Sequence, residues 1–503
     1  MKALEVQTPQ PYSLPLPKAG YAIGGLLAIF IAVITGLNWQ AGLTLTLVLA
    51  YMVLISVRLE WGIYIIVAFA VLCIDGWAPN RSPEDVVFRL SIGHIYIMEF
   101  AVYGLLASYF VRRALDKRPV SDRRLFAVTP LGTPLKVFAA LLPIFAAYGL
   151  MLGNATRDAL GYYEWRSLFM AIILYFLITS IMGTREKALK LFWWFLGLDT
   201  LIGLYSLTLY FVGSRGLSPT ILGTGPVGEG PENYMFVFAA LGAIALLLFC
   251  PEKDVWRRNL IRMAAITPVL NLLLSEKRDP QLGLLVGLFV LSWRIPFRKK
   301  MKVGMAAAGL GALLFLFTAA LGIRASSAGL EKSASRYTEI TEFFQNPKQI
   351  AAMGNETFLF HIFDLVDSFN SIRLRPILGY GFGGRFERKY TALAAVGGES
   401  IVPGIVHDGY LDFWLKMGLV GLAAFLWVFV GFFRFCKANL PRVPNSSYHA
   451  VALGLYAAMW GDVAIEVWGP AWVGNTKMPI VFLSSLALAV CLLRGTNGFE
   501  VAA

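Results

Sequence analysis

The chain has 503 residues, of which 57% are hydrophobic and 15% are charged, and its formal net charge is +13. Soluble globular proteins are roughly half apolar and about a quarter charged, so this composition excludes the ordinary soluble classes. None of the four cysteines falls in the longest polar stretch, 324–406, which argues against a fold built on disulfides.

The hydrophobic residues form continuous apolar blocks rather than alternating ones. Such blocks can cross a hydrocarbon core of about 30 Å as helices, whereas barrel strands would alternate. We therefore predict an all-α polytopic membrane protein, a single integral membrane domain over 1–503 with about 14 transmembrane helices. The expected spans lie near 20–36, 41–56, 61–75, 95–112, 134–152, 166–182, 188–212, 234–250, 259–275, 281–296, 303–323, 407–433, 448–468 and 477–494.

Lysine and arginine cluster in every second short loop. The clusters lie at 112–124, 185–190, 253–258, 294–302 and 434–442. Short loops rich in these residues face the cytoplasm, which places both termini there as well. Membrane orientation accounts for the net positive charge, so no nucleic-acid partner is expected.

The longest connection, 324–406, is predicted to face outward and to precede the twelfth span. Connections of this length are usually functional or disordered, and this one carries helical patterns. An amphipathic stretch covers 333–347 and an apolar stretch covers 358–369. We expect helices lying at the outer membrane interface, with a loosely packed lid as the alternative.

A histidine stands at the mouth of the twelfth span. His407 directly follows the long outward segment, and Gly418 and Gly421 come one helical stretch later. An ionisable side chain at membrane level is costly unless it has a function, and the glycine pair indicates close helix contact. His407 is therefore the first candidate functional residue.

Several arginines lie on the predicted outward side, where the positive-inside rule disfavours them. Arg278 stands in the short turn 276–280, and Arg166 opens the sixth span. Arginine can bind phosphate through two parallel hydrogen bonds, so an anionic ligand explains these two; pairing with nearby acidic residues or lipid phosphates is the alternative. The other outward arginines are Arg215, Arg336, Arg373, Arg375, Arg385 and Arg388.

No metal site is predicted. The sequence has neither an HExxH nor a CxxC motif, and no Asp-x-Asp beside an outward span end. The remaining histidines, His94, His361 and His449, are isolated, and we interpret them as structural.

These residues resemble the bacterial O-antigen ligase and O-antigen polymerase superfamily. His407-Asp408, nine further residues and then Gly418-x-x-Gly421 match the histidine motif of the ligases. Asp408 departs from the motif, in which Asn, Ser or Gln is usual.

Three further positions extend the resemblance, which covers roughly 160–435. Arg278-x-x-x-Leu282 matches the family's arginine motif, and Glu232-Asn233 resembles another family position. The run 376–383 (Pro-Ile-Leu-Gly-Tyr-Gly-Phe-Gly) resembles the proline–glycine signature that precedes the histidine in many members.

The resemblance implies glycan transfer on the periplasmic face of the bacterial inner membrane, without metal or cofactor. The donor would be an oligosaccharide on undecaprenyl diphosphate, and the acceptor a sugar hydroxyl on a second lipid-linked unit or on a lipid A core. It implies His407 as general base and Arg278 and Arg166 as diphosphate clamps, roles that suit a near-neutral imidazole and a charged leaving group.

The further candidate residues and partners are also expectations. Membrane lipids and a chain-length regulator are the other candidate partners. Candidate substrate-binding residues are Asp408, Tyr410, Arg373, Arg375, Arg385, Arg388 and Asn233.

Two other functions stay open. A protein O-oligosaccharyltransferase of the same superfamily would differ only in its acceptor. A lipid-linked oligosaccharide flippase also often has fourteen spans, but such transporters usually show two similar halves and short loops. The absence of an internal repeat and the long segment 324–406 favour the transferase.

Overall fold

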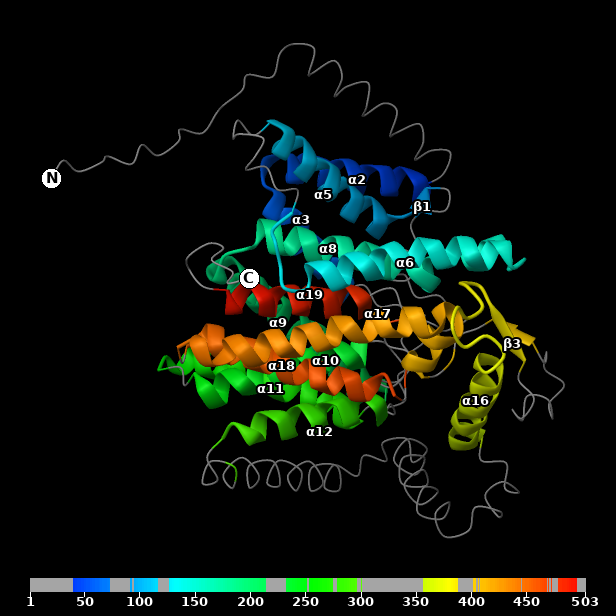
Figure 1. Cartoon of the computed structure of the whole chain (residues 1–503). Helices are drawn as coiled ribbons and strands as arrows, with labels where there is room; N and C mark the ends of the chain where they lie inside the picture. The colour runs from blue at the N-terminus through cyan, green and yellow to red at the C-terminus, as the bar shows by residue number, and fades with distance from the viewer. Residues whose placement is uncertain are drawn as a thin grey trace, which may run out of the picture.

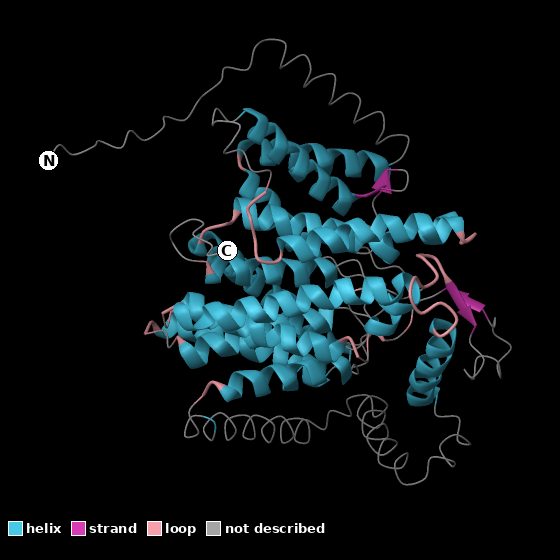
Figure 2. Cartoon of the chain, in the orientation of Figure 1, coloured by secondary structure: helices cyan, strands magenta, loops and turns pink. Residues whose placement is uncertain are grey.

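The computed structural model describes most of the chain's apolar blocks. The described residues are 39–72, 91–92, 95–115, 126–213, 232–250, 253–274, 278–295, 300, 356–387, 401–403, 406, 408–444, 446–467, 469, 472 and 478–494. Over these residues the chain is mostly helical, which confirms the predicted all-α class (Figure 2).

The helices vary from single turns to more than 30 residues. In chain order they are α2 (Trp39–Val57), α3 (Leu59–Leu72), α5 (Ile97–Leu115), α6 (Gly132–Met151), α7 (Thr156–Ala159), the π-helix η2 (Tyr162–Arg166), α8 (Ser167–Ile181), α9 (Arg185–Gly213), α10 (Glu232–Phe249), α11 (Val255–Leu274), α12 (Arg278–Trp293), α16 (Glu356–Ile372), α17 (Gly409–Asn439), the 3₁₀ helix η4 (Leu440–Arg442), α18 (Ser447–Ile465) and α19 (Met478–Leu493).

In the described part of the chain, two small antiparallel pairs of strands accompany the helices. Strand β1 (Ser91–Ile92) pairs with β2 (Ile95–Tyr96). Strand β3 (Arg385–Glu387) pairs with β4 (Ile401–Pro403), and Phe386 lies opposite Val402.

Among the described residues, four helical segments are long and apolar enough to cross a membrane: Gly132–Met151, Glu164–Ile181, Arg185–Thr208 and Gly409–Arg442. Every expected span that falls on described residues coincides with a helix, some of them shorter than a full crossing. The expected spans 20–36 and 303–323 lie outside the described residues, so the total of about 14 stays a prediction.

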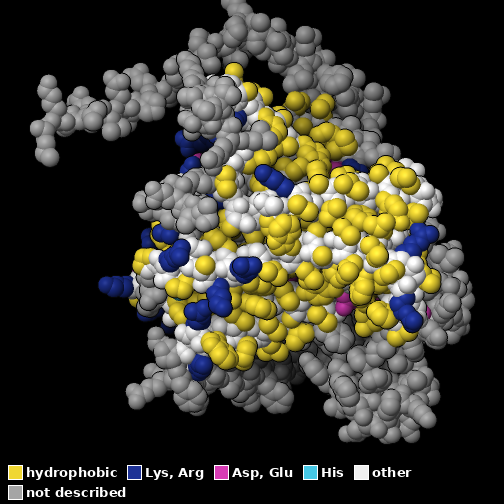
Figure 3. Space-filling view, viewed as in Figure 1, with side chains coloured by type: hydrophobic (Ala, Val, Ile, Leu, Met, Phe, Trp, Pro, Cys, Tyr) yellow, Lys and Arg dark blue, Asp and Glu magenta, His cyan; other side chains and the backbone are white. Residues whose placement is uncertain are grey.

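The long helices run side by side in one bundle (Figure 1). All of α19 is buried, which places this helix in the interior, and α18 packs against both α10 and α12. A broad apolar surface covers the face of the bundle seen in Figure 3, and lysine and arginine gather mainly towards one end of that face. An apolar surface of this kind suits a hydrocarbon environment.

We call the end with most of these cations the basic end. Arg185 at the start of α9 donates from Nε to the Leu492 carbonyl, and Arg494 donates to the Val128 carbonyl. The start of α9 and the end of α19 therefore lie together, next to the residues that lead into α6.

The opposite end carries α16, and we call it the α16 end. Helix α16 runs across the bundle rather than along it, and the β3–β4 pair lies beside it (Figure 1). The helix predicted over 358–369 is confirmed as part of α16, whereas the one expected at 333–347 lies outside the described residues. Phe369 and Trp414 meet edge to face at 6.3 Å, which joins α16 to α17.

Candidate functional site

Helix α17 is broken at Gly418, nine residues after its start. Gly418 has φ 62° and ψ −168°, a conformation that is essentially restricted to glycine. The break frees backbone groups that a continuous helix would pair internally. The amides of Tyr380 and Gly381 donate to the carbonyls of Leu415 and Lys416 at 2.8 and 2.9 Å.

The proline–glycine run thus repairs the break in α17. On the far side of the break, the Leu419 amide donates to the Pro376 carbonyl at 2.9 Å. The Asn154 side-chain amide, just beyond α6, holds the other side of the run through the carbonyls of Tyr380 and Phe382 at 2.9 and 3.0 Å. Two motifs that the sequence analysis treated separately form one structural unit.

The start of α17 is fixed by side chains on both sides of position 407. Before it, the Val406 amide donates to Asp412 Oδ1 at 3.1 Å. After it, the Asp408 carboxylate caps the helix by accepting from the Leu411 amide at 2.8 Å. His407 itself lies outside the described residues, so its assignment as base stays a prediction.

Two further contacts join the start of α17 to the end of α18. The Gly409 amide donates to the Glu466 carbonyl at 2.8 Å, and the Tyr410 hydroxyl donates to the Val463 carbonyl at 2.9 Å. Tyr410, a predicted substrate-binding residue, therefore uses its hydroxyl within the protein.

Asp408 precedes the membrane-crossing part of α17 and is only 8% exposed. Burial raises the pKa of its carboxyl from 3.8 to about 6, against the opposing effect of hydrogen bonds from Leu411 and Tyr410. Because the folded pKa exceeds the unfolded one, the native state binds more protons between these values. The stability contribution of this group therefore falls as the pH rises through about 4 to 6.

We expect Asp408→Asn to stabilise the protein at pH 7 and above and to retain activity. Asparagine caps a helix as well as aspartate but stays neutral, and a shift of two pKa units corresponds to about 3 kcal/mol. Thermal unfolding of both proteins in one detergent at pH 4 and pH 7.5 checks this. A difference between the two proteins that is the same at both pH values contradicts it.

Arg166 forms a two-point ion pair with a buried carboxylate. Its Nε and Nη2 atoms lie 3.0 and 2.5 Å from the two oxygens of Glu99, in the first turn of α5. Its Nη1 also donates to the Leu160 carbonyl at 3.4 Å. Pairing with an acidic residue was the alternative to a phosphate ligand, although the sequence did not single out Glu99. The clamp role of Arg166 stays a prediction.

The residues predicted around the arginine motif come together at the starts of two helices. Helix α12 begins at Arg278, so the short outward turn ends there. Tyr234, in the first turn of α10, donates a hydrogen bond to Asp279. Asn233 is buried and directly precedes Tyr234 in the chain. Because Tyr234 contacts Asp279, Asn233 lies near the start of α12, which begins at Arg278.

Of the other predicted arginines, Arg373, Arg375 and Arg385 lie at the α16 end, whereas Arg215 and Arg336 lie outside the described residues. Arg373 and Arg375 are exposed beyond α16, and the Arg375 guanidinium lies 5.2 Å from the ring centre of Tyr380. Arg385 is the first residue of β3, and Arg388 lies outside the described residues. The part of the chain that is described therefore leaves Arg373 and Arg375 facing solvent at this end.

The sequence analysis missed a buried charged triad. Lys416 Nζ lies 2.9 Å from Glu164 Oε2, on η2, and 3.1 Å from Asp412 Oδ2. The spacing of Asp412 and Lys416, four residues apart on one helix, was the available signal. Glu164 could not be assigned as their partner from local spacing.

A second pair of missed carboxylates lies at the end of α18. Asp462 and Glu466 are both fully buried. Trp472 holds both, because its Nε1 donates to Asp462 Oδ2 at 2.9 Å and its amide donates to Glu466 Oε1 at 3.0 Å. Within the described residues, no group of three or more His, Cys, Asp or Glu side chains could hold a metal ion.

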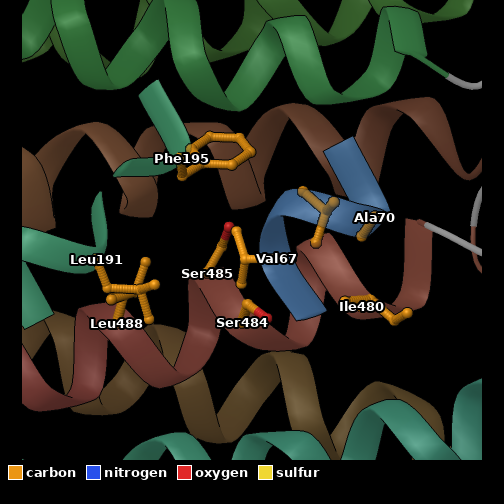
Figure 4. A pocket seen from close by; sticks show the side chains of 9 residues that line it. Val67, Ala70, Leu191, Phe195, Ile480, Ser484, Ser485 and Leu488 are labelled. Atoms are coloured by element: carbon orange, nitrogen blue, oxygen red, sulfur yellow. The ribbon is translucent and has the colours of Figure 1, made fainter. Parts of the chain in front are cut away.

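A small pocket lies elsewhere, between α3, α9 and α19 (Figure 4). Its walls are apolar except for two serines, and it contains none of the predicted site residues. The lining residues are Val67, Ala70, Leu191, Phe195, Ile480, Val481, Ser484, Ser485 and Leu488.

Comparison with known proteins singles out the same part of the chain. A family model described as O-antigen ligase matches residues 263–426. The match includes Arg278, the run 376–383, His407 and the break at Gly418. None of the curated proteins matches the chain. The resemblance to the O-antigen ligase and polymerase superfamily is confirmed over these residues.

Proposed function

Because residues 263–426 match the O-antigen ligase family, we propose that this protein is a membrane glycosyltransferase that uses a lipid-linked donor. It would transfer or polymerise oligosaccharide units carried on undecaprenyl diphosphate during assembly of a cell-surface polysaccharide. The observation that carries the proposal is the joining of the histidine motif and the proline–glycine run at the break in α17.

The charge distribution supports a reaction on the periplasmic face. The basic end would face the cytoplasm, together with both termini, so the α16 end would face the periplasm. The exposed arginines Arg373 and Arg375 would then lie where anionic lipid headgroups and the donor's phosphates are found.

The reaction would be a direct displacement at the anomeric carbon of the donor sugar. His407 takes the proton of the acceptor hydroxyl as its oxygen bonds to that carbon. The bond to the diphosphate breaks, and its electron pair leaves with the diphosphate. Arg278 and Arg166 stabilise the negative charge that develops there, and the configuration at the anomeric carbon is inverted.

The test uses the purified full-length protein with a defined undecaprenyl-diphosphate-linked oligosaccharide, with and without excess EDTA. We expect longer lipid-linked chains, or transfer to lipid A core, in both arms. Loss of turnover on chelation that magnesium restores contradicts the metal-independent mechanism. Transfer only to Ser or Thr of a protein identifies a protein O-oligosaccharyltransferase. Movement of the intact donor across vesicles, without a new glycosidic bond, identifies a flippase.

We expect Arg278→Lys to lower turnover by more than about tenfold, because lysine keeps the charge but cannot present two parallel donors to a diphosphate. Initial rates of donor consumption measure the effect. Arg257→Lys, at an exposed position on the other end of the bundle, is the matched control and should behave as the parent. Turnover of Arg278→Lys within about twofold of the parent, or about 0.4 kcal/mol in barrier, contradicts the clamp.

A further inference from the structure

The charged triad is buried at the α16 end, between η2 and the outer segment of α17, by which we mean the part that precedes the break at Gly418. Lys416 is 1% exposed, and its ammonium group lies within ion-pair distance of the carboxylates of both Asp412 and Glu164. An uncompensated buried charge is strongly destabilising, so each member of the triad depends on the others. The triad fixes the outer segment of α17 against the start of α8.

Asp412 extends the triad to the backbone beside the predicted base. Its Oδ2 faces Lys416, while its Oδ1 accepts the hydrogen bond from the Val406 amide. Val406 directly precedes His407 in the chain. Neighbouring Cα atoms are about 3.8 Å apart, so a shift of Val406 is passed on to the next residue.

A second line of contacts fixes the other partner of Lys416. Glu164 belongs to η2, and π-helical turns are frequent at functional sites. The same turn ends at Arg166, whose ion pair with Glu99 fastens it to α5. The ammonium group of Lys416 is thus held by carboxylates on two elements, η2 and α17.

We propose that Lys416 is a positioning residue for glycan transfer, which holds the Asp412 carboxylate on the Val406 amide and thereby sets the place of His407. The inference rests on the proposed function, because it takes His407 as the base. Buried ion pairs contribute little net stability compared with apolar residues of similar volume. Orientation of a catalytic group can contribute far more, since a displacement of about 1 Å can cost about 10²-fold in rate.

The experiment measures kcat and KM for the defined lipid-linked donor with the full-length protein. Lys416→Met keeps most of the side-chain volume and removes the charge. We expect kcat to fall about 10²-fold while KM for the donor stays within about twofold. Lys187→Met is the matched control: its ion pair with Glu60 at the basic end is half-exposed, and kcat should not change.

Two further variants separate positioning from folding. Lys416→Met/Glu164→Gln removes one of the two carboxylates that lose their partner, and we expect it to regain part of the thermal stability but not kcat. Asp412→Asn keeps an oxygen that can accept from Val406, so it should retain more of the parental kcat than Asp412→Leu.

Three results would overturn the inference. A kcat of the double variant within about twofold of the parent shows that the charge of Lys416 is not needed. Parallel loss of stability and kcat in both Lys416 variants makes the lysine purely structural. Equal activity of Asp412→Asn and Asp412→Leu removes the link to Val406. A parent protein that transfers no glycan, or transfers it without His407, instead rejects the proposed function and the inference with it.

Discussion

His407→Ala is expected to reduce glycan transfer by about 10²- to 10⁴-fold, the usual contribution of a general base. Alanine cannot accept the proton of the acceptor hydroxyl. Insertion and protein level should stay normal, because the contacts of Val406 and Asp408 on either side do not involve the imidazole. Turnover of the defined donor by equal amounts of inserted protein measures the effect.

His449→Ala is the control for this prediction. His449 lies in the first turn of α18, at the basic end, and should be replaceable without loss of turnover. Parental turnover of His407→Ala would remove the base from the proposed mechanism. A pH series on the parent adds a second check, since turnover should fall once the imidazole is protonated.

Gly418→Ala is expected to lower the free energy of unfolding by about 3 kcal/mol or more and to abolish activity. A methyl group at this position would lie 2.0 Å from the Ile377 carbonyl oxygen, and the backbone conformation itself costs any other residue about 1–3 kcal/mol. Relief of the clash separates the proline–glycine run from α17, with the loss of about 1 kcal/mol for each hydrogen bond.

Gly197→Ala provides the matched control. Gly197 lies within α9, and a methyl group there would meet no atom within 4 Å. Alanine favours a helix by roughly 0.5–1 kcal/mol over glycine, so this variant should be as stable as the parent or more so. Thermal unfolding midpoints and donor turnover of both variants decide the matter. Similar midpoints for the two variants contradict the requirement for glycine at 418.

The helices could be predicted because a continuous apolar block long enough to cross a membrane is a pattern that is visible in the local sequence. Helix α16, the histidine motif and the proline–glycine run could also be predicted, since amphipathic spacing and glycine-rich runs are local patterns. The break in α17 was not predicted from Gly418 alone, because a glycine within an apolar block is compatible with a straight helix. The partners of its freed backbone groups lie in the run 376–383, which exchanges hydrogen bonds with α17 from outside the helix.

The partners of the charged residues were beyond the sequence. Arg166 pairs with Glu99, 67 residues earlier, and Lys416 pairs with Glu164 on a different helix. Such pairs depend on how the helices pack, which no local spacing encodes. The sequence therefore identified the candidate arginines and the histidine motif, but not the acidic side chains with which Arg166 and Lys416 pair.

The break in α17 also bears on how the chain is assembled during synthesis. Backbone groups left unpaired in lipid cost several kcal/mol each, so a broken helix is an unfavourable intermediate on its own. The run 376–383 precedes α17 in the chain, so the partners of Leu415, Lys416 and Leu419 leave the ribosome before α17 does. The residues that pair with the broken helix are therefore synthesised before the helix that needs them.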